Sequence, residues 1–428
     1  MNIESLYNIF KNSSAVTTDS RNCPANSIFF ALKGDNFDGN KYAKTAIEQG
    51  SSYAVVDDAN VVEDDRYILV DNVLKALQDL ANYHRKQFKH PVIGITGSNG
   101  KTTTKELLAT VIKTKYNLLY TQGNLNNHIG VPLTLLQMKE DHNMAIIEMG
   151  ANHPNEIAEL CAIAEPDFGI ITNIGKAHLE GFGGYEGVVK TKKELYDFIQ
   201  NKDGKVFVNA QDELLMSLSE SLNRTLYNNE EANFTISVKD ALPTLALNVV
   251  SDTNDVLQTN LVGDYNTINI AAALEIGNYF QIEYKEMKQA LESYIPSNNR
   301  SQIVKTDTNT IILDAYNANP ASMAVAVNNF KNLPNANKIV MLGAMKELGE
   351  YSKDEHQSLV DLIDNNTISQ KFMVGTEFDV IDRRPEDIIF FASTEELKNY
   401  IKENLITDAT ILIKGSRSMK METLMKYL

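Results

Sequence analysis

A glycine-rich turn between an apolar strand and a helix constrains this chain more than any other feature of its sequence. The turn Thr96–Thr103 follows the apolar run Val92–Ile95 and precedes a stretch with apolar residues at helical spacing. Glycines let backbone N–H groups close on phosphate oxygens, and Lys101 and Thr102 are residue types that bridge terminal phosphates and hold magnesium. The pattern predicts a phosphate-binding loop, although Ile95 stands where the strict motif has glycine. A purely structural turn with a surface lysine is the alternative.

Short apolar runs alternate with amphipathic stretches from Pro91 onward. Strands buried on both faces of a parallel sheet are apolar throughout, and the helices between them carry one apolar face. This central region therefore predicts a mostly parallel sheet with helices on both faces. Its further predicted strands are Met144–Ile147, Gly169–Ile171 and Lys205–Val208. Residues 225–262 then alternate like strands, and residues 267–279 return to a helical period.

The two ends of the chain predict further α/β units. The first 85 residues mix short apolar runs with turn-forming clusters, and the last 130 alternate apolar runs with helical stretches. The apolar runs are Ser27–Leu32 and Tyr53–Val56 near the start, and Thr310–Leu313, Ile339–Leu342 and Thr410–Ile413 near the end. The charged segment His84–Pro91 is the first predicted boundary, and a second is placed after Ile295–Pro296.

A chain of 428 residues is expected to form about three domains at roughly 100–200 residues each. We predict an α/β protein with a small N-terminal α/β domain (1–88), a central doubly wound, mostly parallel sheet with the phosphate-binding loop (89–297), and a C-terminal Rossmann-like α/β domain (298–428).

Composition excludes several classes of protein. With 40 Lys and Arg against 56 Asp and Glu, the net charge is −16, which disfavours nucleic acid as a partner. Cys23 and Cys161 are too few for a disulfide framework or a thiolate zinc site. No apolar run approaches the roughly 18 residues that span a bilayer, and the first residues do not resemble a secretory signal. We expect a cytoplasmic protein without membrane insertion.

Three residues beyond the turn are candidates for chemistry. Glu148 directly follows a predicted strand, which places its carboxylate at the edge of the sheet where α/β proteins bind ligands. It is a candidate magnesium ligand, and a solvated strand-end glutamate is the alternative. His178 is expected at the same edge, although such a histidine is more often an ordinary surface or core residue. The run Lys190–Lys193, which contains Lys192, is ordinarily a solvated helical face.

Three strings then resemble one family. Ala177–Gly183, Asp314–Met323 and Lys414–Arg417 are similar to strings of the Mur ligases, ATP-dependent amide-forming enzymes of peptidoglycan assembly. The resemblance runs through nearly the whole chain. The family member that adds diaminopimelate typically has an Asp-Asn-Pro-Arg string in its last domain, and this chain has none.

The resemblance implies a set of nucleotide and metal ligands. Residues that bind ATP phosphates would be Gly97, Ser98, Asn99, Gly100, Lys101, Thr102 and Thr103. Magnesium ligands would be Thr102, Glu148, His178 and Lys192, with Lys192 matching a lysine that the family carbamylates. Asn266 and Asn269 would contact adenine, and Arg300 and Asp314 would close on the nucleotide. Helix capping is the alternative for the asparagines, and an ordinary surface ion pair for Arg300 and Asp314.

The resemblance also reaches the N-terminal domain. Thr18–Arg21 and Gly34–Asn40 look like strings that bind a UDP-sugar, which makes Ser20, Arg21 and Asp38 candidate substrate-binding residues. Asn40 stands where the family usually has histidine. Near the end of the chain, Asn319 and Pro320 predict the cap and first residue of a helix.

The reaction implied is the addition of D-alanyl-D-alanine to UDP-MurNAc-tripeptide. ATP would phosphorylate the peptide's terminal carboxylate, with two Mg²⁺ ions assisting, and the dipeptide amine would displace phosphate from the acyl phosphate. A monomer is expected. The alternatives are a related ligase that adds another amino acid to a muramyl peptide or to folate, and a phosphate-loop kinase or switch ATPase.

Overall fold

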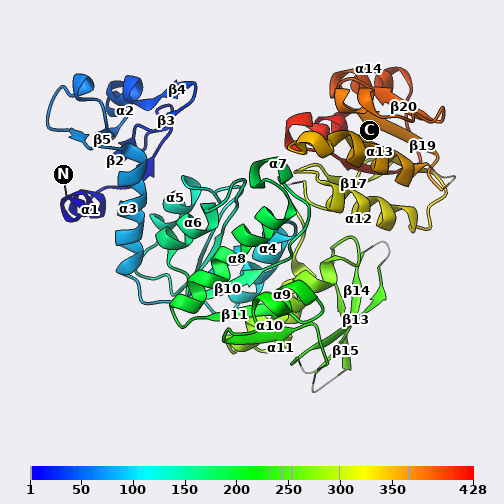
Figure 1. Cartoon of the computed structure of the whole chain (residues 1–428), viewed down its shortest axis with the longest axis horizontal. Helices are drawn as coiled ribbons and strands as arrows, with labels where there is room; N and C mark the ends of the chain where they lie inside the picture. The colour runs from blue at the N-terminus through cyan, green and yellow to red at the C-terminus, as the bar shows by residue number, and fades with distance from the viewer. Residues whose placement is uncertain (1, 231, 242–243, 252–253, 298, 365–366) are drawn as a thin grey trace.

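A six-stranded parallel sheet forms the centre of the structure, a computed structural model that describes residues 2–230, 232–241, 244–251, 254–297, 299–364 and 367–428 (Figure 1). Its strand order is β12-β11-β10-β7-β9-β8. The strands are β7 (Val92–Thr96), β8 (Leu118–Tyr120), β9 (Met144–Glu148), β10 (Phe168–Ile171), β11 (Lys205–Asn209) and β12 (Arg224–Tyr227). The four strands predicted for this region are confirmed, and the apolar runs are explained by burial on both faces.

Helices cover both faces of this sheet, as expected of a doubly wound fold. One apolar core joins the sheet to α4, α10 and α11, and a second joins the opposite face to the remaining helices of the region and to α3. The helices are α3 (Val73–Lys86), α4 (Lys101–Ile112), α5 (Gly130–Leu135), α6 (Glu156–Ala164), α7 (Leu179–Phe182), α8 (Tyr185–Asn201), α9 (Glu213–Leu218), α10 (Asn266–Tyr279) and α11 (Tyr284–Ser293).

The strand-like alternation of residues 225–262 is confirmed. Besides β12, the region forms an antiparallel sheet of β13 (Thr235–Asp240), β14 (Ala246–Val250) and β15 (Asn254–Gln258). The inward residues Leu247, Val249 and Leu257 join the core beneath α10. This sheet supports the helix α10, which begins beside the glycine-rich turn Thr96–Thr103.

The N-terminal domain has a parallel sheet of order β1-β2-β5-β6. Its elements are α1 (Ile3–Lys11), β1 (Val16–Thr17), β2 (Ser27–Phe30), β3 (Lys33–Gly34), β4 (Phe37–Asp38), η1 (Gly39–Tyr42), α2 (Ala43–Glu48), β5 (Ser51–Val56), η2 (Ala59–Val61) and β6 (Tyr67–Leu69). The helix α3 continues from this domain onto α5 and α6, and the buried core runs without a break from one to the other. The two domains therefore share a packed interface.

The C-terminal domain has a second six-stranded sheet, of order β16-β17-β21-β18-β19-β20, in which only β16 is antiparallel to its neighbour. Its elements are β16 (Gln302–Lys305), β17 (Thr310–Asp314), α12 (Pro320–Lys331), β18 (Lys338–Gly343), η3 (Gly349–Tyr351), α13 (Ser352–Ile363), β19 (Gln370–Val374), η4 (Thr376–Val380), β20 (Ile388–Phe391), α14 (Thr394–Glu403), β21 (Thr410–Lys414), η5 (Arg417–Met419) and η6 (Met421–Tyr427). The three predicted strands are confirmed and lie side by side as β17, β21 and β18.

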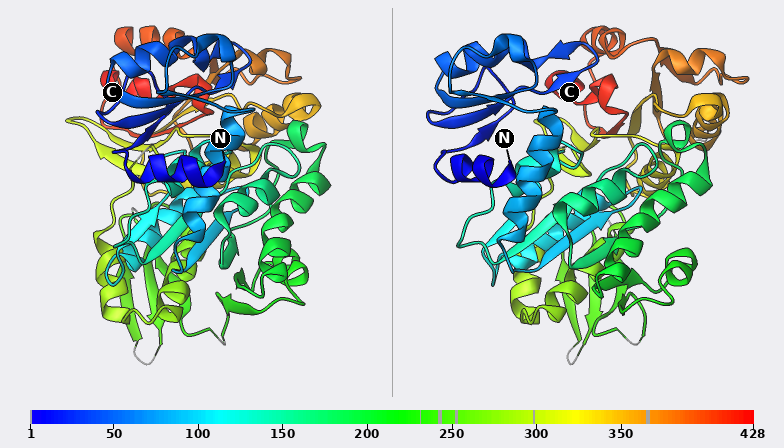
Figure 2. Two further views of the ribbon diagram at one scale, coloured as in Figure 1. Left: turned by 90° about the vertical axis from the view of Figure 1, so that its left-hand side faces the viewer. Right: turned by 60° about the vertical axis from the view of Figure 1, so that its left-hand side comes forward.

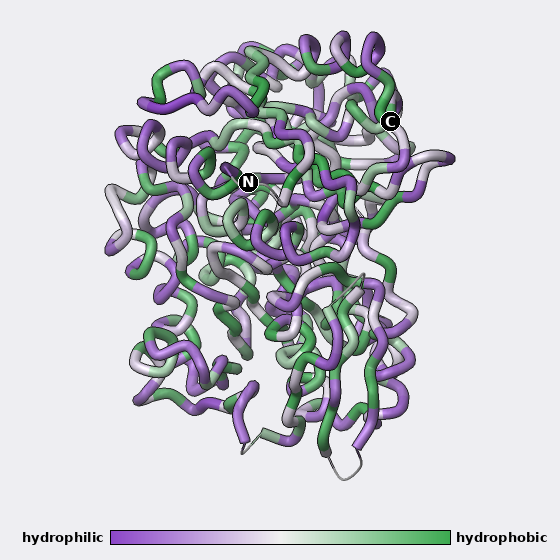
Figure 3. Tube along the Cα trace, turned by 90° about the vertical axis from the view of Figure 1, so that its right-hand side faces the viewer, coloured by the Kyte–Doolittle hydropathy of each residue, from purple (hydrophilic) through white to green (hydrophobic). Residues whose placement is uncertain are grey.

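The N- and C-terminal domains lie on the same side of the central domain, the first in blue and the second in yellow to red (Figures 1 and 2). The domain boundaries at 88/89 and 297/298 stay predictions, and residue 298 lies outside the described residues. Hydrophobic and hydrophilic segments alternate along the trace (Figure 3). In the described part of the chain, no helix combines the length and the apolar character needed to cross a membrane.

One glycine at the start of α5 is required by close packing. A Cβ atom on Gly130 would lie 2.7 Å from the carbonyl oxygen of Leu125 and still nearer to its Cα and carbonyl carbon, all of them backbone atoms that cannot rotate away. We expect Gly130→Ala to lower the free energy of unfolding by about 1–3 kcal/mol, measured by urea denaturation. The matched change Gly34→Ala, where no atom lies within 4 Å, should alter it by less than about 0.5 kcal/mol. Equal stability of the two variants would contradict this packing argument.

Candidate active site

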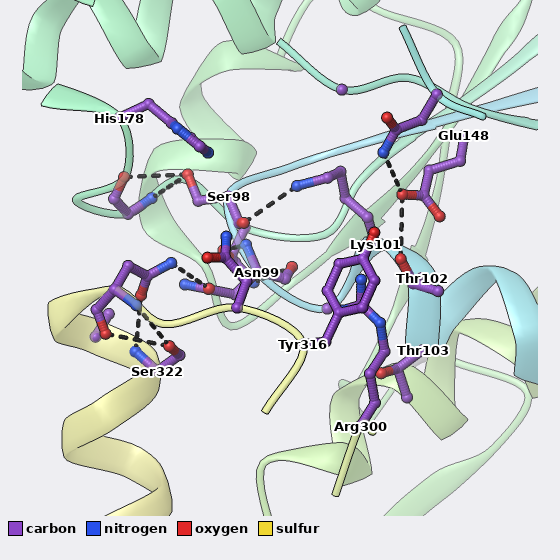
Figure 4. A pocket seen from close by; sticks show the side chains of 18 of the residues that line it. Ser98, Asn99, Lys101, Thr102, Thr103, Glu148, His178, Arg300, Tyr316 and Ser322 are labelled. Carbon is purple, nitrogen blue, oxygen red and sulfur yellow. Dashed lines mark hydrogen bonds between the residues drawn. The ribbon is translucent and has the colours of Figure 1, made fainter. Parts of the chain in front are cut away.

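A cavity of about 690 Å³ lies between the central and C-terminal domains and collects most of the predicted site residues (Figure 4). Those that line it are Ser98, Asn99, Gly100, Lys101, Thr102, Thr103, Glu148, His178, Asn266, Asn269, Arg300 and Asp314. Gly97, Lys192, Ser20, Arg21 and Asp38 do not line it. Residues predicted from six separate stretches of sequence thus meet in one place, with the carboxyl edge of the central sheet on one side.

The turn between β7 and α4 has a backbone that only glycine adopts readily. Gly97 and Gly100 have φ angles of +147° and +79°, and a Cβ on Gly97 would collide with Oγ1 of Thr172 at the end of β10. Lys101 is the first residue of α4, and its Nζ donates to the carbonyl oxygens of Gly97 (2.6 Å) and Ser98 (3.2 Å). A lysine anchored over the turn in this way is not a surface lysine, so the purely structural alternative is disfavoured.

Burial lowers the pKa of Lys101 to about 8, while the negative charge of Glu148 opposes this shift and the positive charge of Arg300 adds to it. Arg300 is thus close enough to act on the Lys101 charge. Two cations that share one cavity favour an anionic ligand there.

Glu148, at the end of β9, presents an oxygen suited to a cation. Its side chain is 1% exposed, and Oε1 accepts hydrogen bonds from Oγ1 of Thr102 (3.1 Å) and Nδ2 of Asn126 (2.8 Å). Oε2 is buried and accepts no hydrogen bond from any residue that the structure describes; the Nζ of Lys105 lies 3.8 Å away. The alternative of a solvated strand-end glutamate is wrong.

A carboxylate with a free buried oxygen beside a threonine hydroxyl fits magnesium. Among the described residues, no three His, Cys, Asp or Glu side chains gather closely enough to hold a metal. A magnesium ion here would therefore need oxygens from a bound substrate as well, which is the usual arrangement when the substrate carries phosphates.

His178 lies at the start of α7 in the left-handed conformation, with φ +51°. Its Nδ1 contacts the carboxylate of Glu347 in the C-terminal domain. Burial lowers the pKa of His178, the Glu347 charge opposes this, and the charge of Lys101 adds to it. The imidazole is therefore held largely neutral at pH 7, the form that binds metals.

Lys192 lies in the middle of α8 and is not part of a solvated helical face. Its side chain is 2% exposed, and its Nζ lies 5.5 Å from the ring centroid of Phe182. Burial, together with the charge of Lys101, lowers the pKa of Lys192 to about 7. Nζ makes no hydrogen bond or ion pair with the residues described here. A neutral buried amine is a nucleophile at physiological pH, which suits modification by carbon dioxide.

Asn266 and Asn269 tie the start of α10 to α4. Oδ1 of Asn269 accepts a hydrogen bond from Oγ1 of Thr104 (3.1 Å), and its Nδ2 donates to Oδ1 of Asn266 (2.9 Å). Nδ2 of Asn266 donates in turn to the carbonyl oxygen of Val262 (2.8 Å). The helix has no side-chain cap, so the capping alternative is wrong for both residues.

Asp314 and Arg300 do not pair with each other. Oδ2 of Asp314 accepts from Nζ of the buried Lys414 (2.6 Å), and Oδ1 accepts from the backbone N of Ser301 (3.1 Å). Arg300 forms no ion pair with a described carboxylate; its guanidinium carbon lies 3.8 Å from the ring centroid of Tyr316. The surface ion pair considered for these two residues is therefore wrong.

Asn319 caps α12, as predicted, in a capping box with Ser322, and Pro320 is the first helical residue. Its role does not end there. Nδ2 of Asn319 also donates to Oδ1 of Asn99 in the phosphate-binding turn (2.7 Å). This bond joins the two domains across the cavity.

The candidate substrate residues of the N-terminal domain lie elsewhere. Arg21 forms an exposed ion pair with Asp19 (2.9 Å), and Asp38 accepts hydrogen bonds from the backbone N (3.1 Å) and Nδ2 (3.0 Å) of Asn40 at the start of η1. Ser20 lies in the turn beside Arg21. The structure does not bring these residues to the cavity, and their contact with a UDP-sugar stays a prediction.

Sequence reasoning missed several side chains of the site. Asn126 orients Glu148, Glu347 contacts His178, Tyr316 stacks on Arg300, and Lys105 is fully buried with its Nζ bonded to the carbonyl oxygen of Thr121 (2.7 Å). Lys105 offered a local signal, because it lies one helical turn after Lys101 and one turn before the apolar Leu108 and Ala109. The others are brought in by contacts distant in sequence.

Known protein families match all three parts of the chain. Three family descriptions match the chain in order: the Mur ligase family catalytic domain over residues 12–87, the Mur ligase middle domain over 95–277, and the Mur ligase glutamate ligase domain over 299–417. A three-domain α/β protein with a phosphate-binding turn facing its last domain is the architecture of an ATP-dependent ligase. The chain belongs to the Mur ligase family.

Individual relatives match over almost the full length. The UDP-N-acetylmuramoyl-tripeptide–D-alanyl-D-alanine ligase of Bacillus subtilis (strain 168) is 33% identical over 427 residues, covering 96% of this chain and 92% of that relative. A MurF structure from Acinetobacter baumannii is 28% identical, covers 99% and 98% of the two chains and superposes with a TM-score of 0.86. MurF ligase from Thermotoga maritima in complex with ADP is 26% identical, with coverage of 98% and 97% and a TM-score of 0.85.

Proposed function

We propose that this chain joins D-alanyl-D-alanine to UDP-MurNAc-tripeptide with consumption of ATP, yielding UDP-MurNAc-pentapeptide, ADP and phosphate. The observation that carries the proposal is the cavity in which the phosphate-binding turn of the central domain meets the last domain through Asn99 and Asn319. The full-length similarity to ligases of this name supports the choice of substrates. The likeness to a relative in complex with ADP supports the nucleotide.

The reaction requires that a carboxylate become an electrophile. A carboxylate resists attack at neutral pH, and transfer of the γ-phosphoryl group of ATP to it creates an acyl phosphate with phosphate as leaving group. The amine of the dipeptide then forms the amide bond and phosphate departs. Lys101 exchanges its bonds to the carbonyls of Gly97 and Ser98 for oxygens of the transferring phosphoryl group, whose charge it neutralises.

Magnesium would be held by Thr102, Glu148 and His178, with Lys192 as a further ligand once it is carbamylated. Bound magnesium would offset the negative charge of the phosphates and the acceptor carboxylate. Carbamylation joins the neutral amine of Lys192 to carbon dioxide and releases a proton, so an uncharged amine becomes an anion able to bind metal. The short distance between Thr102 and Glu148 supports a shared ion (3.1 Å).

Contact between the domains protects the intermediate. An acyl phosphate is readily hydrolysed, so a closed site is needed between its formation and attack by the amine. Contacts that hold the last domain against the central one include those of Asn319 with Asn99, Glu347 with His178, and Glu355 with Lys176. The last domain thus both completes the cavity and limits access of water.

Neutralising Glu148 should weaken magnesium dependence selectively. We expect Glu148→Gln to raise the Mg²⁺ concentration needed for half-maximal turnover at least tenfold. The amide has the same size and still accepts a hydrogen bond, but it lacks the negative charge that attracts the ion. Mg²⁺ titration of ADP release measures this, with ADP binding in EDTA as a second readout that should change less than twofold. The exposed Glu403→Gln is the control. An unchanged Mg²⁺ requirement would show that Glu148 does not bind the ion.

Acceptor specificity tests the proposed function directly. ATP consumption with UDP-MurNAc-tripeptide should be stimulated by D-alanyl-D-alanine and should remain at background with L-glutamate, L-lysine or diaminopimelate. Stimulation by one of these amino acids instead would identify a different ligase of the family. ATP consumption at the same rate without any amine would indicate a kinase or ATPase and overturn the proposal.

A further inference from the structure

Arg300 is a cation in the cavity that lacks a carboxylate partner. Its guanidinium carbon lies 3.8 Å from the centroid of the Tyr316 ring, and its Nε is buried without a hydrogen-bond partner among the described residues. Figure 4 shows the two side chains stacked beside Lys101 and Thr103. A guanidinium stacked on an aromatic ring keeps the N–H groups at its edge available for other ligands.

The backbone next to Arg300 is held from both domains. The hydroxyl groups of Tyr265 in the central domain and Ser301 lie 2.7 Å apart and are hydrogen-bonded. The backbone N of Ser301 donates to Asp314 in the C-terminal domain, which is itself paired with Lys414. The segment that joins the two domains is therefore fixed at Ser301. The long side chain of Arg300 is the part that still needs orientation, and Tyr316 provides it.

The nearby carboxylates are engaged elsewhere. Asp314 pairs with Lys414 at 2.6 Å, and Glu148 is bonded to Thr102 and Asn126. Arg300 therefore faces the cavity without a carboxylate partner among the described residues, close enough to Lys101 for the two positive charges to interact. Phosphates accept the edge of a guanidinium in paired hydrogen bonds, so this arrangement fits the phosphates of a nucleotide.

We propose that Tyr316 is a positioning residue of the nucleotide site, which holds the Arg300 guanidinium so that its N–H edge faces the phosphates. The residue acts through Arg300 and through its ring; the phenol hydroxyl is not needed. This inference rests on the proposed function in one respect, that the cavity binds a nucleotide. The inference goes further, because it requires the Tyr316 ring to be stacked on the Arg300 guanidinium, which nucleotide binding by the cavity does not by itself require.

Calorimetric titration of the whole protein with ADP tests the proposal. Tyr316→Leu should weaken ADP binding about fivefold, because the loss of a partly buried cation–π contact is of that order. Tyr316→Phe should stay within twofold of wild type. Arg300→Met should weaken binding tenfold or more, and Tyr316→Leu added to it should change nothing further. Adenosine, which lacks phosphates, should bind wild type and Tyr316→Leu equally.

A matched pair elsewhere controls for loss of a ring. Arg384 lies 4.2 Å from the centroid of Phe390, far from the cavity, and Phe390→Leu should leave ADP affinity unchanged. If Tyr316→Leu does not fold, as judged by its thermal melt, Tyr316→Met carries the same test. ADP binding equal to wild type in these variants, additive effects with Arg300→Met, or an equal loss for adenosine would overturn the inference. Failure of the wild-type protein to bind ADP would instead overturn the proposed function itself.

Discussion

Lys101→Ala should lower kcat about a thousandfold, while the protein remains folded. The ammonium group stabilises charge that develops on the transferring phosphoryl group, and removal of one such preorganised group typically costs 10²–10³ in rate. Coupled detection of ADP release, with both peptide substrates and Mg²⁺ present, measures the effect. Burial lowers the pKa of Lys101 to about 8, which means that burial disfavours its charged form. Removal of this charge by alanine is therefore not expected to unfold the protein.

The control for this variant lies on the same helix. Lys113 follows the end of α4 and is exposed, with its Nζ over the ring of Tyr120. Lys113→Ala should retain turnover within twofold of wild type. Turnover by Lys101→Ala within tenfold of wild type would contradict the role of Lys101 in phosphoryl transfer.

Lys192→Met should abolish turnover and at the same time stabilise the fold. Methionine fills the volume of the buried side chain but cannot form a carbamate, and it removes an amine that is 2% exposed and lacks a polar partner among described residues. We expect loss of at least 99% of kcat, measured in buffer equilibrated with carbon dioxide so that the wild type can be carbamylated. The melting temperature should rise, measured in buffer depleted of carbon dioxide so that the wild-type amine is unmodified. Increased stability with lost activity separates a functional lysine from a structural one.

The stability gain should depend on pH. The pKa of Lys192 is about 7 in the folded chain, well below the ordinary value near 10.5. Between these values the unfolded chain binds a proton that the folded chain does not, so wild-type stability rises with pH across this window. Below pH 7 Lys192 is charged in the folded chain as well, so the free energy of unfolding is reduced by the full penalty for burying that charge. The advantage of the methionine variant should therefore be largest at pH 6.5 and smaller at pH 9.

Chemical rescue distinguishes a carbamate from other uses of this lysine. Lys192→Ala should be inactive, and formate or acetate should restore a measurable fraction of turnover by supplying the missing carboxylate. The same anions should not restore Lys101→Ala. Full activity of Lys192→Ala without added carboxylate would remove the carbamate from the mechanism.

Local patterns in the sequence were sufficient to predict the glycine-rich turn before α4 and the strands of the sheets. Gly97 and Gly100 give the turn before α4 its conformation, and Lys101 and Thr102 begin the helix. Apolar runs as short as Met144–Ile147 are typical of strands buried on both faces. The cap at Asn319 was predictable for the same reason.

Contacts distant in sequence were not predictable from local patterns. The partner of Asp314 lies 100 residues away, at Lys414, and Glu347 reaches His178 from another domain. The burial of Lys192 depends on which face of α8 packs against the protein. The sequence Lys190–Lys193 contains three lysines and is typical of an exposed helical face, so it does not predict that one of them is buried. The specific roles proposed for these residues came from the resemblance to the Mur ligases. The structure shows that Asp314 and Arg300 do not form a surface ion pair and that Lys192 is not on a solvated helical face.

Mass analysis of the products formed from ATP, UDP-MurNAc-tripeptide and D-alanyl-D-alanine with Mg²⁺ is the decisive test of the proposed ligase activity. We expect a UDP-linked product heavier than the tripeptide substrate by one D-alanyl-D-alanine less one water, formed in equal amount with ADP and phosphate. ATP hydrolysis with both peptides left unjoined would contradict it.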